Sequence, residues 1–214
     1  MSDKQILLIL GGTFHDFDGF ADTIRPTLQD NGYQIHATYN LNELLTLNES
    51  NFNVVIFYTC FGSARQDGER PPGPTPMQTD ALVKWVRAGG GLLAAHAATV
   101  TGQTNPEFAQ LVGGAFISHP PQFNFTVYPM FQEHPITKGV ESFTVFDEFY
   151  MQNYDPVVEI HAAAVDRGVA YPTVWSKPEG AGRVAHIALG HSARVWALSA
   201  YQQLMSQAVD WLVE

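Results

Sequence analysis

Four short runs that carry almost only apolar side chains constrain the fold of this chain most. They are residues 5–10 (QILLIL), 53–59 (NVVIFYT), 91–96 (GLLAAH) and 182–191 (GRVAHIALGH). A strand with one buried face alternates polar and apolar residues, whereas a strand covered on both faces is apolar throughout. Strands of the second kind are typical of parallel sheets that lie between two layers of helices. The runs therefore predict a parallel sheet enclosed by helices.

The segments between these runs contain helix signals. Residues 20–31 end before Gly32, which suits the position just past a helix, although Pro26 would kink that helix or delay its start. Thr75 is a good N-cap and Pro76 a good first residue for a second helix, which Gly89 closes. Residues 201–212 place apolar side chains at helical spacing and predict a last helix.

The middle of the chain has a different pattern. The segments NFTVYP, SFTVFDEFYM, VVEIHAAAV and VAYPTVWS are short and strand-like and alternate in polarity. They predict an antiparallel extension of a mostly parallel α/β sheet. With 214 residues of which 45% are hydrophobic, we expect a single domain over residues 1–214.

Charge and cysteine content exclude several classes of partner. The chain has 11 basic and 21 acidic residues, a formal charge of −10, and no stretch that concentrates the basic ones. Nucleic acid and anionic membrane are therefore poor partners, and a small neutral substrate or a protein partner suits this charge better. A single cysteine allows no intramolecular disulfide, and the first apolar run is too short for a signal peptide. We expect a cytoplasmic protein, and the sequence leaves a homo-oligomer open.

Three of the apolar runs end in turns that carry histidine. His15 follows the first run in GGTFHDF, His96 ends the third, and His191 ends the last. Ligands of open α/β sheets bind beyond the carboxyl ends of the parallel strands. Because these ends meet at one edge of the sheet, we expect the three imidazoles to share one cleft. The small residues after His96 leave room there for a ligand.

The other five histidines have simpler interpretations. His36 and His161 lie inside strand-like segments, where a structural role is strongly favoured. His186 lies within the last apolar run and is expected to be a hydrogen-bonded core residue. His119 and His134 each precede a proline and suit ordinary turns.

Two acidic residues interrupt an apolar and aromatic segment, VFDEFY. A charge in such surroundings destabilises the fold unless it is paired or used. One interpretation is a salt bridge with Arg183 or another base. The other is a carboxylate that faces the cleft and ligates a metal or acts as a general base. We favour the structural interpretation for Asp147 and leave both open for Glu148.

The histidines and Glu148 permit two kinds of chemistry. Zinc takes imidazole and carboxylate ligands, and a catalytic zinc keeps about three protein ligands and one open position. A divalent metal such as Zn²⁺ is therefore one expectation, although no local HExxH or CxxC spacing supports it. The alternative is acid–base catalysis without a metal, since the pKa of imidazole lies close to neutrality.

Other catalytic and cofactor motifs receive little support. Cys60 follows an apolar run, but a lone cysteine beside a buried strand is usually inert. The chain contains no GxSxG, GxxxxGK[ST] or GxGxxG motif, and its glycine triplet precedes a strand rather than a helix. No nucleotide cofactor is expected.

Several segments together resemble the ThuA-like, or trehalose-utilisation, family. The matching segments are LLILGGTFHDF, WVRAGGGLLAAHAA, LVGGAFISHP, EHPITKG, FDEFY and GRVAHIALGH, in the family's order and over nearly the whole chain. Each segment is weak evidence alone, and the set is fairly specific.

The resemblance implies a flavodoxin-like fold of the class I glutamine amidotransferase type. In those amidotransferases a cysteine occupies the sharp turn after the glycine-led strand, and His96 stands at or near that place, so glutamine amidotransferase activity is not expected. The family's motif histidines look like His15, His96, His119 and His191, and its acidic motif looks like Glu148. The resemblance also implies use of trehalose and related disaccharides through keto-sugar intermediates, and a metal in this cleft in some relatives.

We therefore expect an enzyme that isomerises, hydrolyses or eliminates a sugar or keto-sugar derivative. His96 would be a general base or metal ligand, His15 and His191 would complete the site, and Glu148 would supply the carboxylate. Three aromatic residues are candidates either to stack on a sugar ring or to belong to the core: Phe14, Tyr150 and Trp196. The alternative is a non-catalytic module that senses a sugar or binds a partner with the same cleft.

Overall fold

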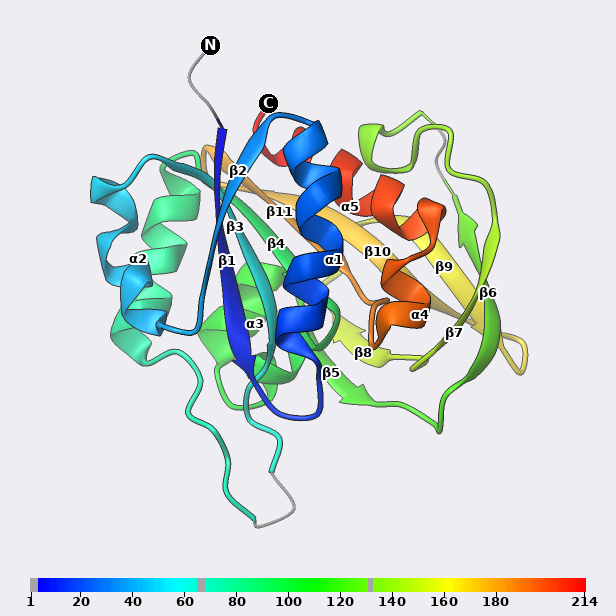
Figure 1. The fold of residues 1–214 in the computed structure, drawn as a ribbon. Helices are drawn as coiled ribbons and strands as arrows, with labels where there is room; N and C mark the ends of the chain where they lie inside the picture. Colours follow the sequence, from blue (N-terminus) through cyan, green and yellow to red (C-terminus); the bar gives the residue numbers. More distant parts are fainter. Residues whose placement is uncertain (1–3, 65–67, 131–132) are drawn as a thin grey trace.

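A computed structural model describes residues 4–64, 68–130 and 133–214 of the chain. Its centre is a nine-stranded sheet with the order β2-β1-β3-β4-β11-β10-β9-β6-β7, and strands β5 and β8 pair in a small second sheet (Figure 1). No helix among the described residues is long and apolar enough to cross a membrane.

The strands are β1 (Lys4–Gly12), β2 (Tyr33–Thr38), β3 (Phe52–Cys60), β4 (Gly91–Ala95), β5 (Gly114–Ser118), β6 (Phe123–Pro129), β7 (Phe143–Asp147), β8 (Met151–Tyr154), β9 (Glu159–Asp166), β10 (Val169–Glu179) and β11 (Gly182–Ile187). The α-helices are α1 (Phe17–Asp30), α2 (Pro76–Arg87), α3 (Pro106–Val112), α4 (Ala193–Trp196) and α5 (Ser199–Leu212). Three segments form 3-10 helices: η1 (Leu41–Glu49), η2 (His96–Gln103) and η3 (Pro135–Thr137).

The pairing of the strands confirms the predicted fold class. Strands β2, β1, β3, β4 and β11 run parallel to one another, and β10, β9, β6 and β7 continue the same sheet in antiparallel pairs. Most of the middle section thus extends the central sheet, whereas β8 pairs with β5 outside it. The whole is a mixed α/β architecture consistent with a flavodoxin-like fold.

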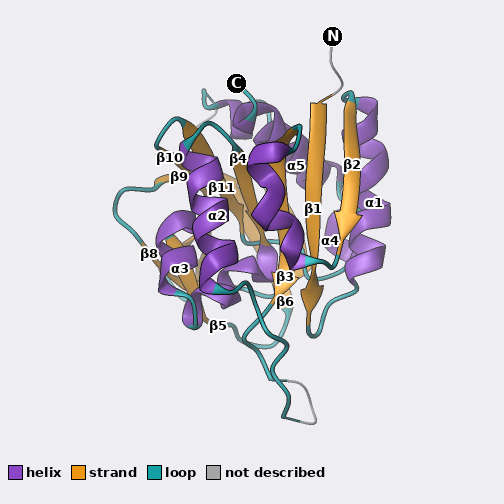
Figure 2. Cartoon of the chain, turned by 90° about the vertical axis from the view of Figure 1, so that its left-hand side faces the viewer, coloured by secondary structure: helices purple, strands orange, loops and turns teal. Residues whose placement is uncertain are grey.

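Helices cover both faces of the sheet, which explains the apolar runs (Figure 2). In β1, Ile6 and Leu8 belong to a core cluster with residues of α1, α4 and α5, whereas Leu7 and Ile9 belong to a second cluster with residues of α2 and α3. Because successive side chains of a strand point to opposite faces, both sets must be apolar.

The helix signals in the sequence are confirmed with small shifts. Helix α1 begins at Phe17, where Asp16 accepts a hydrogen bond from the Gly19 N–H, and it continues through Pro26. Helix α2 has Thr75 as N-cap, in a reciprocal pair of hydrogen bonds with Gln78. The segments η1 and α3 were not predicted; both are short, and α3 is only seven residues long.

His186 is a hydrogen-bonded core residue, as the sequence predicts. Its side chain is fully buried in β11, and its Nδ1 lies 2.7 Å from the carbonyl oxygen of Ala94. Burial lowers the pKa of His186 to about 3, so the imidazole is neutral in the folded protein at pH 7.

This buried histidine should make the fold sensitive to acid. Below pH 6.5 the imidazole takes a proton in the unfolded chain but not in the folded one, so stability falls as pH falls. The expected loss is about 1.4 kcal/mol per pH unit for each such group. The free energy of unfolding, measured with urea, should fall less between pH 7 and pH 5 in His186→Gln than in the wild type. His36→Gln, at an exposed side chain beside Glu43, is the control and should keep the wild-type slope.

Candidate functional site

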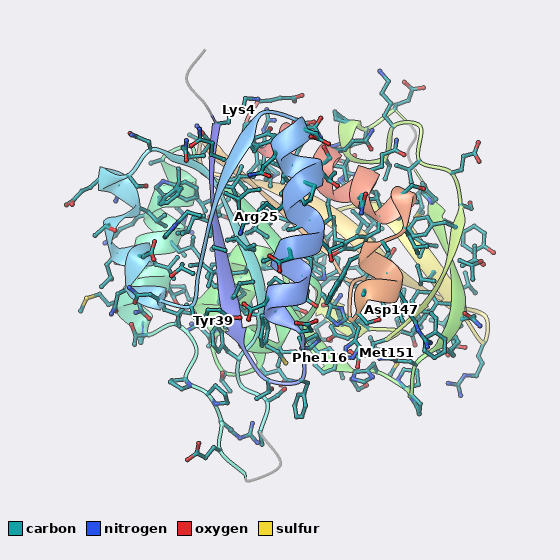
Figure 3. All side chains as sticks on the ribbon, in the orientation of Figure 1. Lys4, Arg25, Tyr39, Phe116, Asp147 and Met151 are labelled. Atoms are coloured by element: carbon teal, nitrogen blue, oxygen red, sulfur yellow. The ribbon has the colours of Figure 1, made fainter. Side chains whose placement is uncertain are left out.

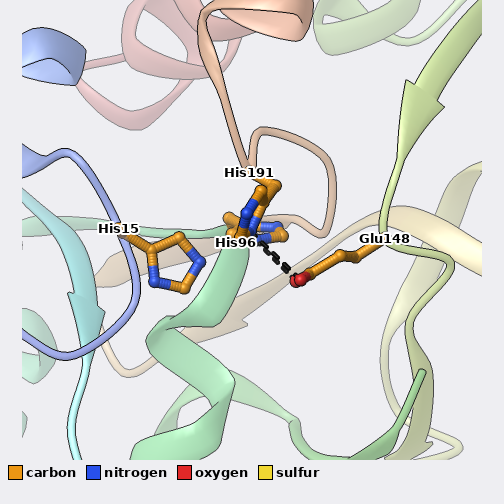
Figure 4. Close-up of side chains that lie close together, drawn as sticks. All are labelled: His15, His96, Glu148 and His191. Carbon is orange, nitrogen blue, oxygen red and sulfur yellow. Dashed lines mark ion pairs between the residues drawn. The ribbon is translucent and has the colours of Figure 1, made fainter. Parts of the chain in front are cut away.

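Three histidines from distant parts of the chain meet beyond the carboxyl ends of the parallel strands (Figure 4). The centroid of the His15 ring lies 4.9 Å from that of His96 and 4.8 Å from that of His191. The rings of His96 and His191 are 5.7 Å apart. The structure thus brings together the three imidazoles that the strand-end argument selected.

His96 sits in a strained turn directly after β4. Its φ of 48° lies in the left-handed region, which few non-glycine residues adopt. The side chain is fully buried, and its Nδ1 lies 2.7 Å from the carbonyl oxygen of Ala188. A carbonyl can only accept, so Nδ1 carries the proton and donates it. The lone pair of Nε2 then faces the hydroxyl of Tyr150, at 3.3 Å, and the cleft.

His15 is held in the same way by the loop after β1. Its Nδ1 donates to the carbonyl oxygen of Thr13 over 2.8 Å, which leaves Nε2 as an acceptor. That Nε2 is buried and has no hydrogen-bond partner among the described residues. Burial, and then the proximity of His96, lower the pKa of His15 to about 3. The loop needs Gly12: its φ is 111°, and a Cβ there would lie 2.3 Å from the carbonyl oxygen of Cys60.

Glu148 connects the histidines. Its carboxylate oxygens lie 3.2 Å from Nδ1 of His191, 3.4 Å from Nε2 of His96 and 3.6 Å from Nε2 of His119. Burial by itself would raise the pKa of Glu148, but the proximity of His191 and His96 outweighs it and holds the pKa well below its usual range. The same carboxylate raises the pKa of His191 against the opposing effect of burial.

Asp147 has a structural role, as the sequence suggested, but with a different partner. Its side chain is fully buried and accepts hydrogen bonds from the backbone N–H groups of Gly190, at 2.7 Å, and His191, at 3.1 Å. The suggested salt bridge with Arg183 is wrong, because Arg183 pairs with Glu214 at the far end of β11. Asp147 thus fixes the turn that carries His191.

A cavity of about 460 Å³ opens onto this cluster. Its lining residues come from four loops and from the β5–β8 region: Phe14, His15, Cys60, Ser63, Val100, Phe116, His119, Glu148, Tyr150 and His191. In Figure 3 the labelled Phe116, Asp147 and Met151 lie at the lower end of the molecule, opposite Lys4 at the start of β1. The cavity therefore lies at the edge where ligands of open α/β sheets bind.

The aromatic candidates divide between cavity and core. Phe14 is 61% exposed and lines the cavity together with Tyr150. Trp196 is wrong as a ligand contact, since it is buried and its Nε1 donates to the carbonyl oxygen of Gly190. Phe116 was missed, although it lies in β5 within the segment LVGGAFISHP that carries the family resemblance, because only His119 of that segment was considered for the site.

Four side chains form a compact set of donor atoms. One nitrogen or oxygen from each of His15, His96, Glu148 and His191 lies within 4.8 Å of the others. His119 stays outside this set, although it contacts Glu148 and is 34% exposed at its side chain. The arrangement can hold a cation or exchange protons with a ligand in the cavity.

The segment over residues 63–76 is rich in Pro and Gly, a composition that predicts a mobile loop or a lid. Residues 65–67 lie outside the described residues, and the described remainder has no helix or strand before Pro76.

Cys60 is expected to be dispensable for activity. Burial raises the pKa of its thiol, and its Sγ lies near the hydroxyls of Thr13 and Ser63 rather than next to a base. A protonated thiol is a poor nucleophile. Cys60→Ser should therefore keep activity within about twofold of the wild type, and iodoacetamide should modify the folded protein slowly at pH 8. Loss of activity in Cys60→Ser, with the melting temperature unchanged, would support a cysteine hydrolase instead.

Comparison with known proteins gives a consistent result. The family model ThuA, described as "Trehalose utilisation", matches residues 6–212. No curated protein sequence matches the chain.

Solved structures share the fold at low sequence identity. A ThuA-like protein from Parabacteroides merdae ATCC 43184 has a TM-score of 0.83 and 17% identity, over 99% of this chain and 90% of that one. A ThuA-like protein from Bacteroides uniformis ATCC 8492 has a TM-score of 0.75 and 20% identity, over 99% and 91%. A structure from Salmonella typhimurium LT2, described as a cytoplasmic protein, has a TM-score of 0.72 and 12% identity, over 98% and 100%.

Proposed function

Because the chain belongs to the ThuA family, described as trehalose utilisation, we propose that it is an enzyme acting on a sugar or keto-sugar derivative. The reaction takes place in the cavity beside His15, His96, Glu148 and His191. The observation that supports this proposal best is the orientation of His15 and His96, whose Nδ1 atoms donate to backbone carbonyls so that each Nε2 carries a lone pair.

The same observation tests whether the residues fit a divalent metal. Metal-binding imidazoles characteristically donate their second nitrogen to a carbonyl or carboxylate, which fixes the tautomer that ligates. His15 and His96 satisfy this condition, and the buried Nε2 of His15 has no other partner among the described residues. With Glu148 and His191 the set offers three imidazoles and one carboxylate, a combination that suits Zn²⁺. The residues fit the group.

We assign the four residues of this set to holding the metal. A divalent metal there would polarise a carbonyl or hydroxyl oxygen of the sugar. Glu148, with its lowered pKa, is a weak base and suits the role of ligand. His96 is fully buried behind Tyr150 and does not line the cavity, so it holds the site together rather than touching the substrate.

The residues that face the sugar are others. His119 lines the cavity, is partly exposed and lies next to Glu148, so it is the imidazole placed to exchange a proton with the substrate. Phe14 and Tyr150 provide aromatic surface for a sugar ring. Isomerisation, hydrolysis and elimination at a carbonyl-bearing sugar all need such a proton transfer and stabilisation of an oxyanion.

Two features support a cytoplasmic setting. The single cysteine lies buried as a free thiol, which suits a reducing compartment. The net charge of −10 disfavours nucleic acid and anionic lipid and leaves a small carbohydrate as the preferred partner.

The test is turnover of a panel of keto-disaccharides by protein purified without a histidine tag and supplied with Zn²⁺. His96→Asn is the variant of choice, because asparagine tolerates the left-handed backbone better than alanine does. We expect turnover in the wild type and none in the variant, with an unchanged circular dichroism spectrum. Binding without turnover across the whole panel would favour a sugar-binding module and overturn the enzymatic assignment.

A further inference from the structure

A second group of potential ligands lies at the opposite end of the sheet. One ligand atom from each of His134, Glu159 and His161 lies within 4.8 Å of the others. Strand β9 runs parallel to β4 and β11, as its antiparallel pairing with β10 requires, so Glu159 and His161 lie at its start, away from the cavity. The connection between β6 and β7, which carries His134, lies at the upper end of Figure 1, whereas β1 and β3 point downward.

His161 carries the strongest evidence. Its side chain is fully buried, and its Nε2 lies 2.7 Å from the hydroxyl oxygen of Ser176. Its Nδ1 is buried and has no hydrogen-bond partner in the described part of the chain. A buried polar atom without a hydrogen-bond partner destabilises the fold and is uncommon in proteins. The unpaired Nδ1 of His161 therefore indicates a ligand at this position. Burial, and then the proximity of His134, lower the pKa of His161 to about 3, which keeps a lone pair available at neutral pH.

The imidazole of His134 stacks on the imidazole of His161. The two imidazole centroids are 3.8 Å apart and nearly parallel. His134 is the N-cap of η3, and its Nδ1 accepts a hydrogen bond from the Ile136 N–H. That bond uses Nδ1 as acceptor, so the proton is on Nε2 in the metal-free protein. Nε2 becomes a ligand when the proton moves to Nδ1, and the bond from the Ile136 N–H is given up in exchange. Burial lowers the pKa of His134 as well.

Glu159 supplies a carboxylate to this group. It precedes His161 by two residues in β9, and a carboxylate oxygen lies within 4.8 Å of a ring nitrogen of each histidine. Glu159 is exposed at the edge of the site. Zinc–ligand bonds are about 2.0–2.2 Å long, so binding of an ion would draw the three side chains closer together.

We propose that His134, Glu159 and His161 form a second binding site, for a divalent transition metal of the zinc class. Two imidazoles and one carboxylate are ligands that Zn²⁺ accepts, whereas Mg²⁺ and Ca²⁺ prefer oxygen. A water molecule completes the coordination. The ion joins the start of β9 to the connection between β6 and β7, two segments far apart in sequence, and so stabilises the antiparallel half of the sheet. The site is independent of the proposed function.

The test is the number of zinc ions bound per chain after equilibrium dialysis of the full chain. We expect two in the wild type. Glu148→Gln should retain the ion at the second site, and Glu159→Gln combined with His134→Asn should retain only the ion at the first. Asparagine is chosen because it keeps the N-cap acceptor while removing the imidazole. Glu141→Gln, at an exposed residue between η3 and β7, is the matched control and should bind as the wild type does.

A stability measurement separates binding from a change in fold. In the Glu148→Gln background, zinc at about a hundredfold excess over its dissociation constant should raise the melting temperature by roughly 5–10 °C. Adding Glu159→Gln and His134→Asn should abolish this shift, and adding Glu141→Gln should not. If Glu148→Gln binds no zinc, or if the triple variant binds it as tightly as Glu148→Gln does, the second site is refuted. Neither outcome depends on whether the protein turns over a sugar.

Discussion

Glu148→Gln is expected to weaken metal binding in the cavity and to lower turnover by a factor of about 100 or more. Glutamine keeps the size of the side chain but removes the negative charge that lies within 3.6 Å of three imidazoles. A neutral amide compensates the charge of a divalent ion poorly. It also leaves His191 without the partner that raises its pKa. Metal content measured by mass spectrometry, together with turnover at saturating substrate, checks both effects.

The matched control for this prediction is Glu107→Gln. Glu107 is exposed in the first turn of α3 and does not line the cavity, so its substitution should change neither metal content nor turnover. If Glu148→Gln kept both its metal and its activity while the protein stayed folded, Glu148 would not be a ligand. The four-residue set would then need a different interpretation.

The positions of the parallel strand ends could be predicted because they depend on local sequence patterns. A strand buried on both faces is visible as an unbroken apolar run, and the carboxyl ends of parallel strands must share one edge. His15, His96 and His191 could therefore be grouped from the sequence alone. Their tautomers could not, because the carbonyls of Thr13 and Ala188 that fix them depend on loop geometry.

The antiparallel half of the sheet was harder to interpret, since its pairing is set by contacts between distant segments. His161 was expected to be merely structural, because nothing in the sequence of β9 shows that His134 stacks on it from the β6–β7 connection. Phe116 was overlooked for the same reason: only the pairing of β5 with β8 brings it next to Tyr150. The sequence indicates that a charge at Asp147 would destabilise the fold unless it is paired. It does not identify the partners, because these are backbone N–H groups.

Asp147→Asn is expected to destabilise the protein by roughly 2–5 kcal/mol, although Asp147 does not line the cavity. The carboxylate accepts the backbone N–H groups of Gly190 and His191, both deep in the structure. An asparagine side chain has one carbonyl oxygen, so its amide group must face one of these donors and leave it unsatisfied. The melting temperature should fall by roughly 5–15 °C. Asp80→Asn, which breaks an exposed ion pair with Lys84, should lower it by no more than about 2–4 °C.

The same substitution should also affect the site through the turn that it anchors. His191 follows Gly190, whose φ of 122° is held partly by the bond to Asp147, so a looser turn no longer keeps Nδ1 of His191 at 3.2 Å from Glu148. Zinc affinity in the cavity should therefore fall about 10–100-fold at a temperature where the variant is still folded. Zinc added in excess should restore part of the turnover that Asp147→Asn loses. It should not restore the turnover of Glu148→Gln, because that variant lacks a metal ligand. A variant as stable as the wild type, with wild-type zinc affinity, would show that Asp147 does not position His191.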